Sequence, residues 1–269
     1  KPMIDYKKIL TTAIDDAFGQ TIQEVDYWIK FNGYTLTDHF FVINDRGRGI
    51  VGRELNLVSL PGVDGAKLKG VRYTERTIEI DTLFIAANDA ELRKILEEIN
   101  YILATDKEEA LIFSDEPDRT YYAVFSTAQE SEGQNGVYKV TLTFVCPNPE
   151  KEAAETVVTT ETNSPTVVKN DGKRAVTPTI TCVFESDAST YEIQLLKEDE
   201  TIEKRIKVNF NFIKGDTLVI DFEKRKVIIN GKVNMNALLM LSRWFNIPVG
   251  EITVNTTHKS SISFNKAYM

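Results

Sequence analysis

Few side chains in this sequence are of the types that perform acid–base chemistry, and they are scattered along the chain. The two histidines, His39 and His258, are far apart in the sequence. Asp38 precedes His39, and a histidine oriented by a carboxylate can activate a serine or cysteine nucleophile. No nucleophile motif accompanies this pair. A structural or surface histidine is therefore the favoured interpretation of His39.

One acidic run could hold a hard cation. Three carboxylates lie within Ser114–Arg119, and calcium prefers several oxygen ligands. The residue spacing of a calcium-binding loop is absent from this run. The run therefore predicts a solvated acidic turn, with a metal site as the less favoured alternative.

Two basic segments could contact anions. Gly47-Arg48-Gly49 is small and flexible, but it lacks the strand–turn–helix context of a phosphate-binding loop, so it predicts a loop with an exposed arginine. The charged run Glu223–Lys226 predicts the tip of a hairpin, and anion contact is the second option there.

Two tryptophans, Trp28 and Trp244, could stack on sugars in a binding module, although burial in or near the core is the favoured interpretation. The nucleophile-elbow, dinucleotide-binding, phosphate-loop and zinc-protease motifs are all absent. The sequence therefore yields no catalytic, cofactor-binding or metal-binding residue. We expect neither enzymatic activity nor a bound cofactor.

The composition is that of a folded, acidic protein. The 269 residues are 42% apolar and 27% charged, which excludes disorder of the whole chain. The net charge of -8 argues against a sequence-independent grip on nucleic acid. No apolar stretch is long enough to span a membrane. We expect Cys146 and Cys182 to be reduced thiols.

The first half of the sequence alternates between strand patterns and one clear helix. Residues 5–18 predict a short helix, and Asn32-Gly33 predicts a two-residue hairpin turn. The apolar stripe of residues 89–103 predicts an amphipathic helix, with Asn88 and Glu91 as a capping box. Strands are predicted at residues 27–31, 40–43, 54–60, 76–85, 110–113, 121–128 and 138–145.

The second half reads as all-β. Short strand patterns recur with turn signals between them, among them Asn230-Gly231, which is typical of a β-sandwich. Residues 235–243 are expected to form one or two helical turns. The strands are predicted at residues 155–160, 177–184, 190–196, 201–212, 217–222, 226–230, 250–255 and 260–265.

These patterns predict a mainly β protein with one amphipathic helix. Pro147 and Pro149 mark a domain boundary. We expect an N-terminal extension at residues 1–26, a β domain at 27–148 that contains the helix at 89–103, and a β-sandwich at 149–269. Because no catalytic motif is found, an enzymatic function has no positive support in the sequence.

The order of several short motifs resembles one known family. From residue 27 onward the sequence is similar to the distal tail proteins of long-tailed siphovirus bacteriophages and related prophages of Gram-positive hosts. The motifs that carry the resemblance are Asn32-Gly33-Tyr34, Arg46-Gly47-Arg48-Gly49-Ile50, Pro61-Gly62-Val63-Asp64-Gly65, Leu111-Ile112-Phe113, Phe144-x-Cys146-Pro147-x-Pro149, Lys214-Gly215-Asp216 and Asn230-Gly231.

The resemblance implies a tail-tube-like N-terminal β domain, a galectin-like C-terminal β-sandwich and a role as a virion component. It implies a homo-hexameric ring that joins the tail tube protein above to the tail-associated hub or lysin protein below. Receptor-binding or baseplate proteins are further candidate partners, DNA only transits the channel, and no membrane is involved. Assembly would take place in the host cytoplasm, at the tip of the growing phage tail. Strands 76–85 and 138–145 are expected to offer sheet edges to neighbouring subunits.

Two alternatives stay open. Residues 1–26 precede the usual start of the family, and an arm that reaches a neighbouring subunit is the favoured interpretation. The second function considered is a carbohydrate-binding or adhesion module that recognises the host cell wall. It would require an aromatic-lined groove with converging polar groups in residues 150–269. The sugar-reading residues of galectins are not found there.

Overall fold

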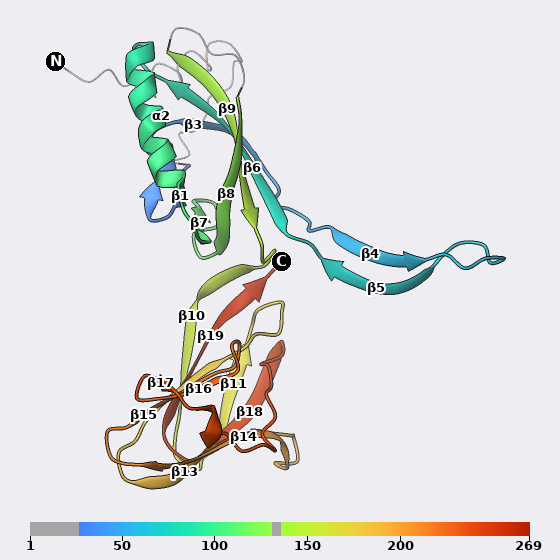
Figure 1. The fold of residues 1–269 in the computed structure, drawn as a ribbon, viewed down its shortest axis with the longest axis vertical. Coiled ribbons are helices and arrows are strands. Elements are labelled where there is room, and N and C mark those ends of the chain that lie inside the picture. Colours follow the sequence, from blue (N-terminus) through green and yellow to red (C-terminus); the bar gives the residue numbers. More distant parts are fainter. Residues whose placement is uncertain (1–26, 131–135) are drawn as a thin grey trace. The chain divides into compact units, whose positions relative to one another are not determined.

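The computed structural model describes residues 27–130 and 136–269. Over these ranges the chain is mostly strands with one α-helix, which confirms the predicted fold class (Figure 1). The helix predicted at residues 5–18, and the extension 1–26 as a whole, lie outside the described residues. The chain divides into two compact units, an N-terminal unit that ends at Pro149 and a C-terminal unit that begins at Glu150.

The strands of the N-terminal unit form two connected antiparallel arrangements and a separate hairpin. One arrangement has the order β3-β6-β9-β8. The start of β8 also pairs with β7, which continues through β1 to β2. The strands β4 and β5 form a sheet by themselves. The elements are β1 (Ile29–Phe31), β2 (Tyr34–Thr35), the 3-10 helix η1 (Leu36–Asp38), β3 (Phe41–Arg46), β4 (Arg53–Val58), β5 (Lys67–Tyr73), β6 (Arg76–Ile85), α2 (Asp89–Leu103), β7 (Glu109–Phe113), β8 (Thr120–Glu130) and β9 (Val137–Cys146).

The first hairpin turns where the sequence predicts. Asn32 and Gly33 both have positive φ, at 50° and 79°, as a two-residue turn with the right twist requires. Phe31 then pairs with Tyr34 across the turn. The second Asn-Gly signal behaves in the same way, with φ of 50° at Asn230 and 77° at Gly231.

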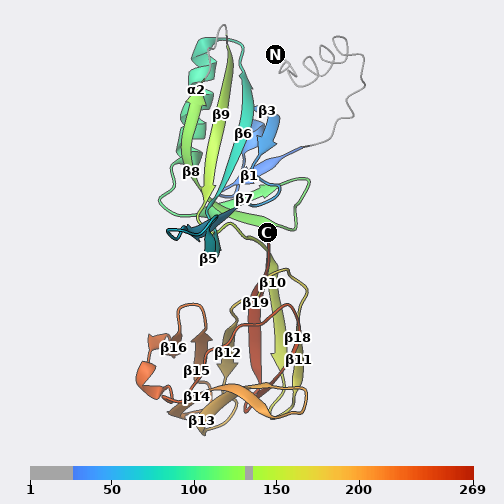
Figure 2. The same cartoon turned by 90° about the vertical axis from the view of Figure 1, so that its right-hand side faces the viewer.

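Helix α2 covers one face of the sheet (Figure 2). The side chain of Asn88 accepts a hydrogen bond from the Glu91 amide at 2.9 Å, so the predicted cap at the helix start is confirmed. Glu91 accepts from the Ala87 amide rather than from Asn88. The apolar side of the helix joins the core formed by the inward residues of β6 and β9. Its buried residues are Leu92, Ile99, Ile102 and Leu103.

Gly47, in the connection between β3 and β6, cannot be replaced without strain, for two separate reasons. Its φ is +93°, and an added Cβ would lie 1.9 Å from the carbonyl oxygen of Thr77. We expect Gly47→Ala to lower the free energy of unfolding of the N-terminal unit by about 2–4 kcal/mol, measured by urea denaturation.

The matched control for Gly47→Ala is Gly49→Ala, because an added Cβ at Gly49 meets no atom within 4 Å. That control should change the free energy of unfolding by less than about 1 kcal/mol. Equal urea midpoints of unfolding for Gly47→Ala and Gly49→Ala would contradict this account of the loop.

The C-terminal unit is a two-sheet β-sandwich. One sheet has the order β17-β16-β15-β12-β19-β10, and the other has the order β11-β18-β13-β14. Their inward residues form one buried apolar cluster that includes Tyr191, Ile193 and Ile262. The elements are β10 (Lys151–Thr160), β11 (Thr166–Asn170), β12 (Thr179–Val183), β13 (Ala188–Leu196), β14 (Ile202–Phe212), β15 (Thr217–Asp221), β16 (Lys226–Ile229), β17 (Lys232–Val233), the 3-10 helix η2 (Met235–Ala237), β18 (Gly250–Thr256) and β19 (Ser260–Tyr268).

The segment after β17 is less helical than predicted. Only η2 is helical, and the expected continuation to residue 243 is wrong. Beyond η2 the chain follows the outer edge of β14, where the Leu239 amide donates to the Lys207 carbonyl at 2.9 Å and the Arg243 amide donates to the Arg205 carbonyl at 2.8 Å. The hydrogen-bonding groups of an otherwise open strand edge thus determine this conformation.

Candidate functional site

The structure keeps the two histidines in structural positions and in different units. In the N-terminal unit, His39 ends η1, and its Nδ1 lies 3.8 Å from a carboxylate oxygen of Glu98. In the C-terminal unit, His258 packs on the rings of Phe184 and Tyr191, and burial lowers its pKa below the usual value. The described residues place no group of three or more histidine, cysteine or acidic side chains where a metal ion could be held.

Arg48 and the acidic run come together, which the sequence did not predict. The Arg48 guanidinium donates to Asp115 at 2.7 Å and to Asp45 at 3.2 Å, and it lies 3.9 Å from the centre of the Phe113 ring. Tyr27 donates to the same Asp45 at 2.5 Å, and burial together with this bond raises the pKa of the Tyr27 phenol.

The prediction of an exposed arginine at position 48 is therefore wrong. The Arg48 side chain is only 12% exposed, because nearby carboxylates match its charge and its Cζ lies over the Phe113 ring. The acidic run is a turn between β7 and β8, but Asp115 binds this arginine instead of being only solvated. The cluster ties β3, β7 and the start of β1 together.

The other charged run matches its prediction. Residues Glu223–Arg225 form the turn between β15 and β16, and all three are exposed. Arg225 takes a positive φ of 50° at this hairpin tip.

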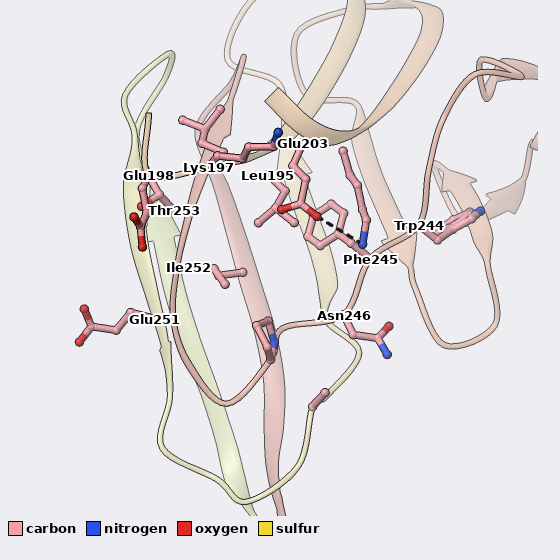
Figure 3. Close-up of a pocket in the computed structure, with 14 residues that line it drawn as sticks. Leu195, Lys197, Glu198, Glu203, Trp244, Phe245, Asn246, Glu251, Ile252 and Thr253 are labelled. Atoms are coloured by element: carbon pink, nitrogen blue, oxygen red, sulfur yellow. Dashed lines mark ion pairs between the residues drawn. The ribbon is translucent and has the colours of Figure 1, made fainter. Parts of the chain in front are cut away.

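The C-terminal unit has a depression of about 600 Å³ beside β13 and β18 (Figure 3). Its floor includes Leu195, Phe245 and Ile252, and its charged lining includes Glu203 and Lys204, which form an ion pair at 3.8 Å. Trp244 lies at the margin of this group, with its ring directed away from Leu195 and packed edge-on against Phe222. Of the two aromatic residues that line the depression, Phe245 is buried and Trp244 is partly buried.

The most unusual surface of the N-terminal unit is the hairpin of β4 and β5. One face of it is apolar: Leu55 pairs with Val71, and Leu57 pairs with Leu68. These four side chains are 44–58% exposed. The opposite face is polar, with an Arg72–Glu54 ion pair at 2.6 Å. Figure 1 shows the two strands running side by side with no third strand against them.

The sheet β3-β6-β9-β8 has two open edges of different sequence. Strand β3 pairs only with β6 among the described strands, and the part of β8 from Ser126 to Glu130 pairs only with β9. The expectation that residues 76–85 and 138–145 form the edges is wrong. These residues are β6 and β9, which are each paired on both sides.

Comparison with known proteins identifies the family. Residues 31–146 match the family described as the phage tail protein RIFT-related domain, and residues 171–268 match the family described as the siphovirus-type tail component, C-terminal domain. The chain is 38% identical over 245 residues to the distal tail protein of Bacillus phage SPP1. The aligned part covers 90% of this chain and 96% of that protein. The chain belongs to the siphovirus distal tail protein family.

Solved structures agree with this family membership. The SPP1 distal tail protein, described as a hub adsorption apparatus of phages that infect Gram-positive hosts, matches with a TM-score of 0.82 and 32% identity over 90% of this chain and 99% of that one. A chain of the phage P2 baseplate in its calcium-bound activated conformation matches with a TM-score of 0.53 and 8% identity, over 89% and 98% of the two chains. The second likeness concerns the fold alone.

For a distal tail protein, the residues of interest are those that could meet other tail proteins. The sequence pointed to residues 76–85 and 138–145, which are not sheet edges, and it did not point to the β4–β5 hairpin. The alternation of Leu55 and Leu57 was visible, but alternation alone does not tell whether the apolar side of a strand faces a core or a partner. The signal for an exposed hairpin is the loop beyond it, Pro61-Gly62-Val63-Asp64-Gly65, which returns the chain directly into β5.

The two cysteines are free and buried, which agrees with the expected reduced thiols. Burial raises the pKa of each thiol from 9.0 to about 11. At pH 8 the reactive thiolate is therefore about 100-fold scarcer than in the unfolded chain. We expect Ellman's reagent to leave both cysteines of the native protein unmodified and to titrate both after denaturation. Rapid modification of either native thiol would contradict this prediction.

Proposed function

We propose that this protein is a structural component of the distal end of a siphovirus tail, where six copies form a ring around the channel. The ring would connect the tail tube to the tail-tip adsorption apparatus. The observation that carries this proposal is the amphipathic β4–β5 hairpin, whose apolar face has no partner among the described residues of a single chain.

The hairpin supports assembly for an energetic reason. An isolated two-stranded hairpin is at best marginally stable in water, because it has no second layer to cover its apolar face. Leu55, Leu57, Leu68 and Val71 are about half exposed. A neighbouring copy of the chain would remove these side chains from water and would fix the hairpin in one position.

The two sheet edges support a ring rather than a two-fold dimer. Strand β3 and the later part of β8 are different surfaces at opposite ends of one sheet. Joining the β3 edge of one copy to the β8 edge of the next is a heterologous contact, and such contacts close into rings when the rotation permits. The same contact would protect edges that otherwise promote aggregation.

The partners follow from the position in the tail. The SPP1 relative is described as a hub adsorption apparatus. By analogy we assign this chain a tail tube protein on one side of the ring, a tail-associated hub or lysin protein on the other, and receptor-binding or baseplate proteins around it. DNA would only pass through the channel, and assembly would take place in the host cytoplasm. We assign the chain no catalytic role.

No observation favours the alternative of a carbohydrate-binding module strongly enough to propose it. That alternative requires an aromatic-lined groove with converging polar groups. The two aromatic residues that line the depression of the C-terminal unit belong to its core: Trp244 packs edge-on against Phe222, and Phe245 is buried. No helix among the described residues is long and apolar enough to cross a membrane.

The position in the virion can be tested by labelling. Gold-labelled Fab fragments raised against this protein should bind intact tails at the end distal to the head, in electron micrographs. Control Fab fragments against the tail tube protein should not mark that tip. Labelling along the whole tail, or on the head, would contradict the proposed function.

A further inference from the structure

A turn of the C-terminal unit displays two large apolar side chains. Residues Leu239–Ser242 form a turn that is closed by a hydrogen bond from the Ser242 amide to the Leu239 carbonyl at 2.9 Å. Its two central residues, Met240 and Leu241, are 98% and 74% exposed. Central turn positions usually carry glycine, proline, asparagine or aspartate. Methionine and leucine at these positions expose apolar surface to water, which is unfavourable, and they do not stabilise the turn itself.

This turn, which we call the Met240 turn, is held firmly. The Leu239 amide donates to the Lys207 carbonyl, and the Arg243 amide donates to the Arg205 carbonyl. The Ser242 hydroxyl oxygen accepts from the Lys207 amide at 3.1 Å. Because both ends of the turn are bonded to β14, its backbone is held in place and both apolar side chains project from a fixed position. Binding a partner there would therefore cost little backbone conformational entropy of the turn.

The surface next to the turn is basic. A depression of about 300 Å³ beside Leu241 contains Ile202 and Arg243. Its other lining residues are Glu203, Lys204, Arg205 and Leu241, so it carries three positive charges and one negative charge. Lys204 pairs with Glu203 and Arg205 pairs with Glu192, whereas Arg243 makes no ion pair with any residue that the structure describes. The guanidinium of Arg243 thus supplies the unpaired positive charge of this depression.

We propose that the Met240 turn and the basic depression beside it form a docking surface for a second protein of the tail tip. The partner would present an apolar pocket bordered by carboxylates. Methionine and leucine would fill the pocket, and arginine and lysine would meet its acidic rim. This inference rests on the proposed function, because it takes the partner to be another component of the tail.

The charges favour a different protein over a second copy of this chain. In a two-fold contact between two Met240 turns, the basic depression of one copy would approach that of the other. Like charges at the edge of such an interface oppose association. A partner with an acidic rim would instead be attracted to Arg243 and Lys204.

The first test measures whether the turn is covered in tails. Hydrogen peroxide oxidises exposed methionine, so Met240 should react rapidly in the purified protein. In purified intact tails we expect oxidation of Met240 to slow by at least about tenfold, as read by mass spectrometry. A methionine-containing reference peptide added to both samples reports the oxidant dose. Equal rates in tails and in the purified protein would overturn the proposal.

The second test uses variants and zero-length cross-linking of the same tails. Tails assembled with the double variant Met240→Ser/Leu241→Ser should keep this protein at the wild-type ratio but lose at least about tenfold of one other tail protein. Carbodiimide should join Lys204 to a carboxylate of that protein in wild-type tails. The matched control is Ile213→Ser, which removes a 61%-exposed apolar side chain from another turn and should leave the composition unchanged.

The outcomes separate this inference from the function on which it rests. Unchanged composition of the double-variant tails would overturn the docking surface and leave the tail position intact. Protection of Met240 in the purified protein without tails would assign the surface to a second copy and would also overturn it. Absence of the protein from tails would overturn the proposed function itself.

Discussion

Replacing both Leu55 and Leu57 with glutamate is expected to convert the proposed ring into monomers. Both side chains lie on the apolar face of the β4–β5 hairpin and are 53% and 54% exposed in the single chain. In the ring they would be buried, and an unpaired buried carboxylate costs several kcal/mol. The apparent dissociation constant should rise by at least about 100-fold, which corresponds to about 2.7 kcal/mol. Mass photometry measures this directly.

The matched control for the double glutamate variant is Asn56→Glu. Asn56 is exposed and lies on the opposite face of the same hairpin. This variant adds a similar charge without placing it on the apolar face, so it should still form rings. Both variants should unfold at temperatures within a few degrees of the wild type, since neither changes the buried core. Rings of normal mass from the double glutamate variant would show that the apolar face is not the contact.

Replacing Arg48 with methionine is expected to destabilise the N-terminal unit by about 3–5 kcal/mol. The guanidinium holds Asp45 and Asp115, and its side chain is only 12% exposed. Methionine fills a similar volume over the Phe113 ring but leaves the half-buried Asp45 carboxylate without its cation. Breaking one side of a largely buried pair is far more costly than removing the whole pair. Urea denaturation, monitored separately for each unit, should show the shift in the N-terminal transition.

Arg72→Met serves as the comparison for Arg48→Met. Arg72 also pairs with a carboxylate, that of Glu54, but the two side chains are 76% and 52% exposed. An exposed pair contributes at most about 1 kcal/mol. Similar losses of stability in the two variants would contradict the role assigned to the Arg48 cluster.

Local chemistry made some elements predictable from the sequence. The Asn32-Gly33 and Asn230-Gly231 turns require positive φ at two successive positions, and few other residue pairs accept it. Helix α2 combines an apolar stripe with a capping residue, so periodicity and end signal agree on the same boundaries. Both signals depend only on neighbours in the sequence.

Three features that depend on contacts outside their own segment were not predicted. Strand β5 is interrupted by Gly70 and is rich in lysine, so it lacks a strand pattern, yet the preceding loop returns it onto β4. The expected exposure of Arg48 was wrong because its carboxylate partner Asp115 lies 67 positions away in the sequence. Residues after η2 were expected to be helical, but the open edge of β14 offered them hydrogen bonds.

The sheet edges that are candidate interfaces could not be predicted from the alternation of apolar residues. Strands β6 and β9 have the longest and cleanest alternation, and this made them look like candidates for the sheet edges. Alternation reports that one face of a strand is buried, and it does not tell whether the strand lies at an edge. The edges, β3 and the end of β8, carry weaker patterns because few of their side chains are buried on either face.

The most direct test of the central claim is the mass and shape of the purified protein. Negative-stain electron microscopy and mass photometry should reveal rings with a central pore and a mass of 6 × 30.5 = 183 kDa, or twice that value for two stacked rings. The Asn56→Glu variant should give the same rings, and the double glutamate variant should give 30.5 kDa monomers. Wild-type protein that stays monomeric in solution, and is not arranged as a ring in intact tails, would contradict the account.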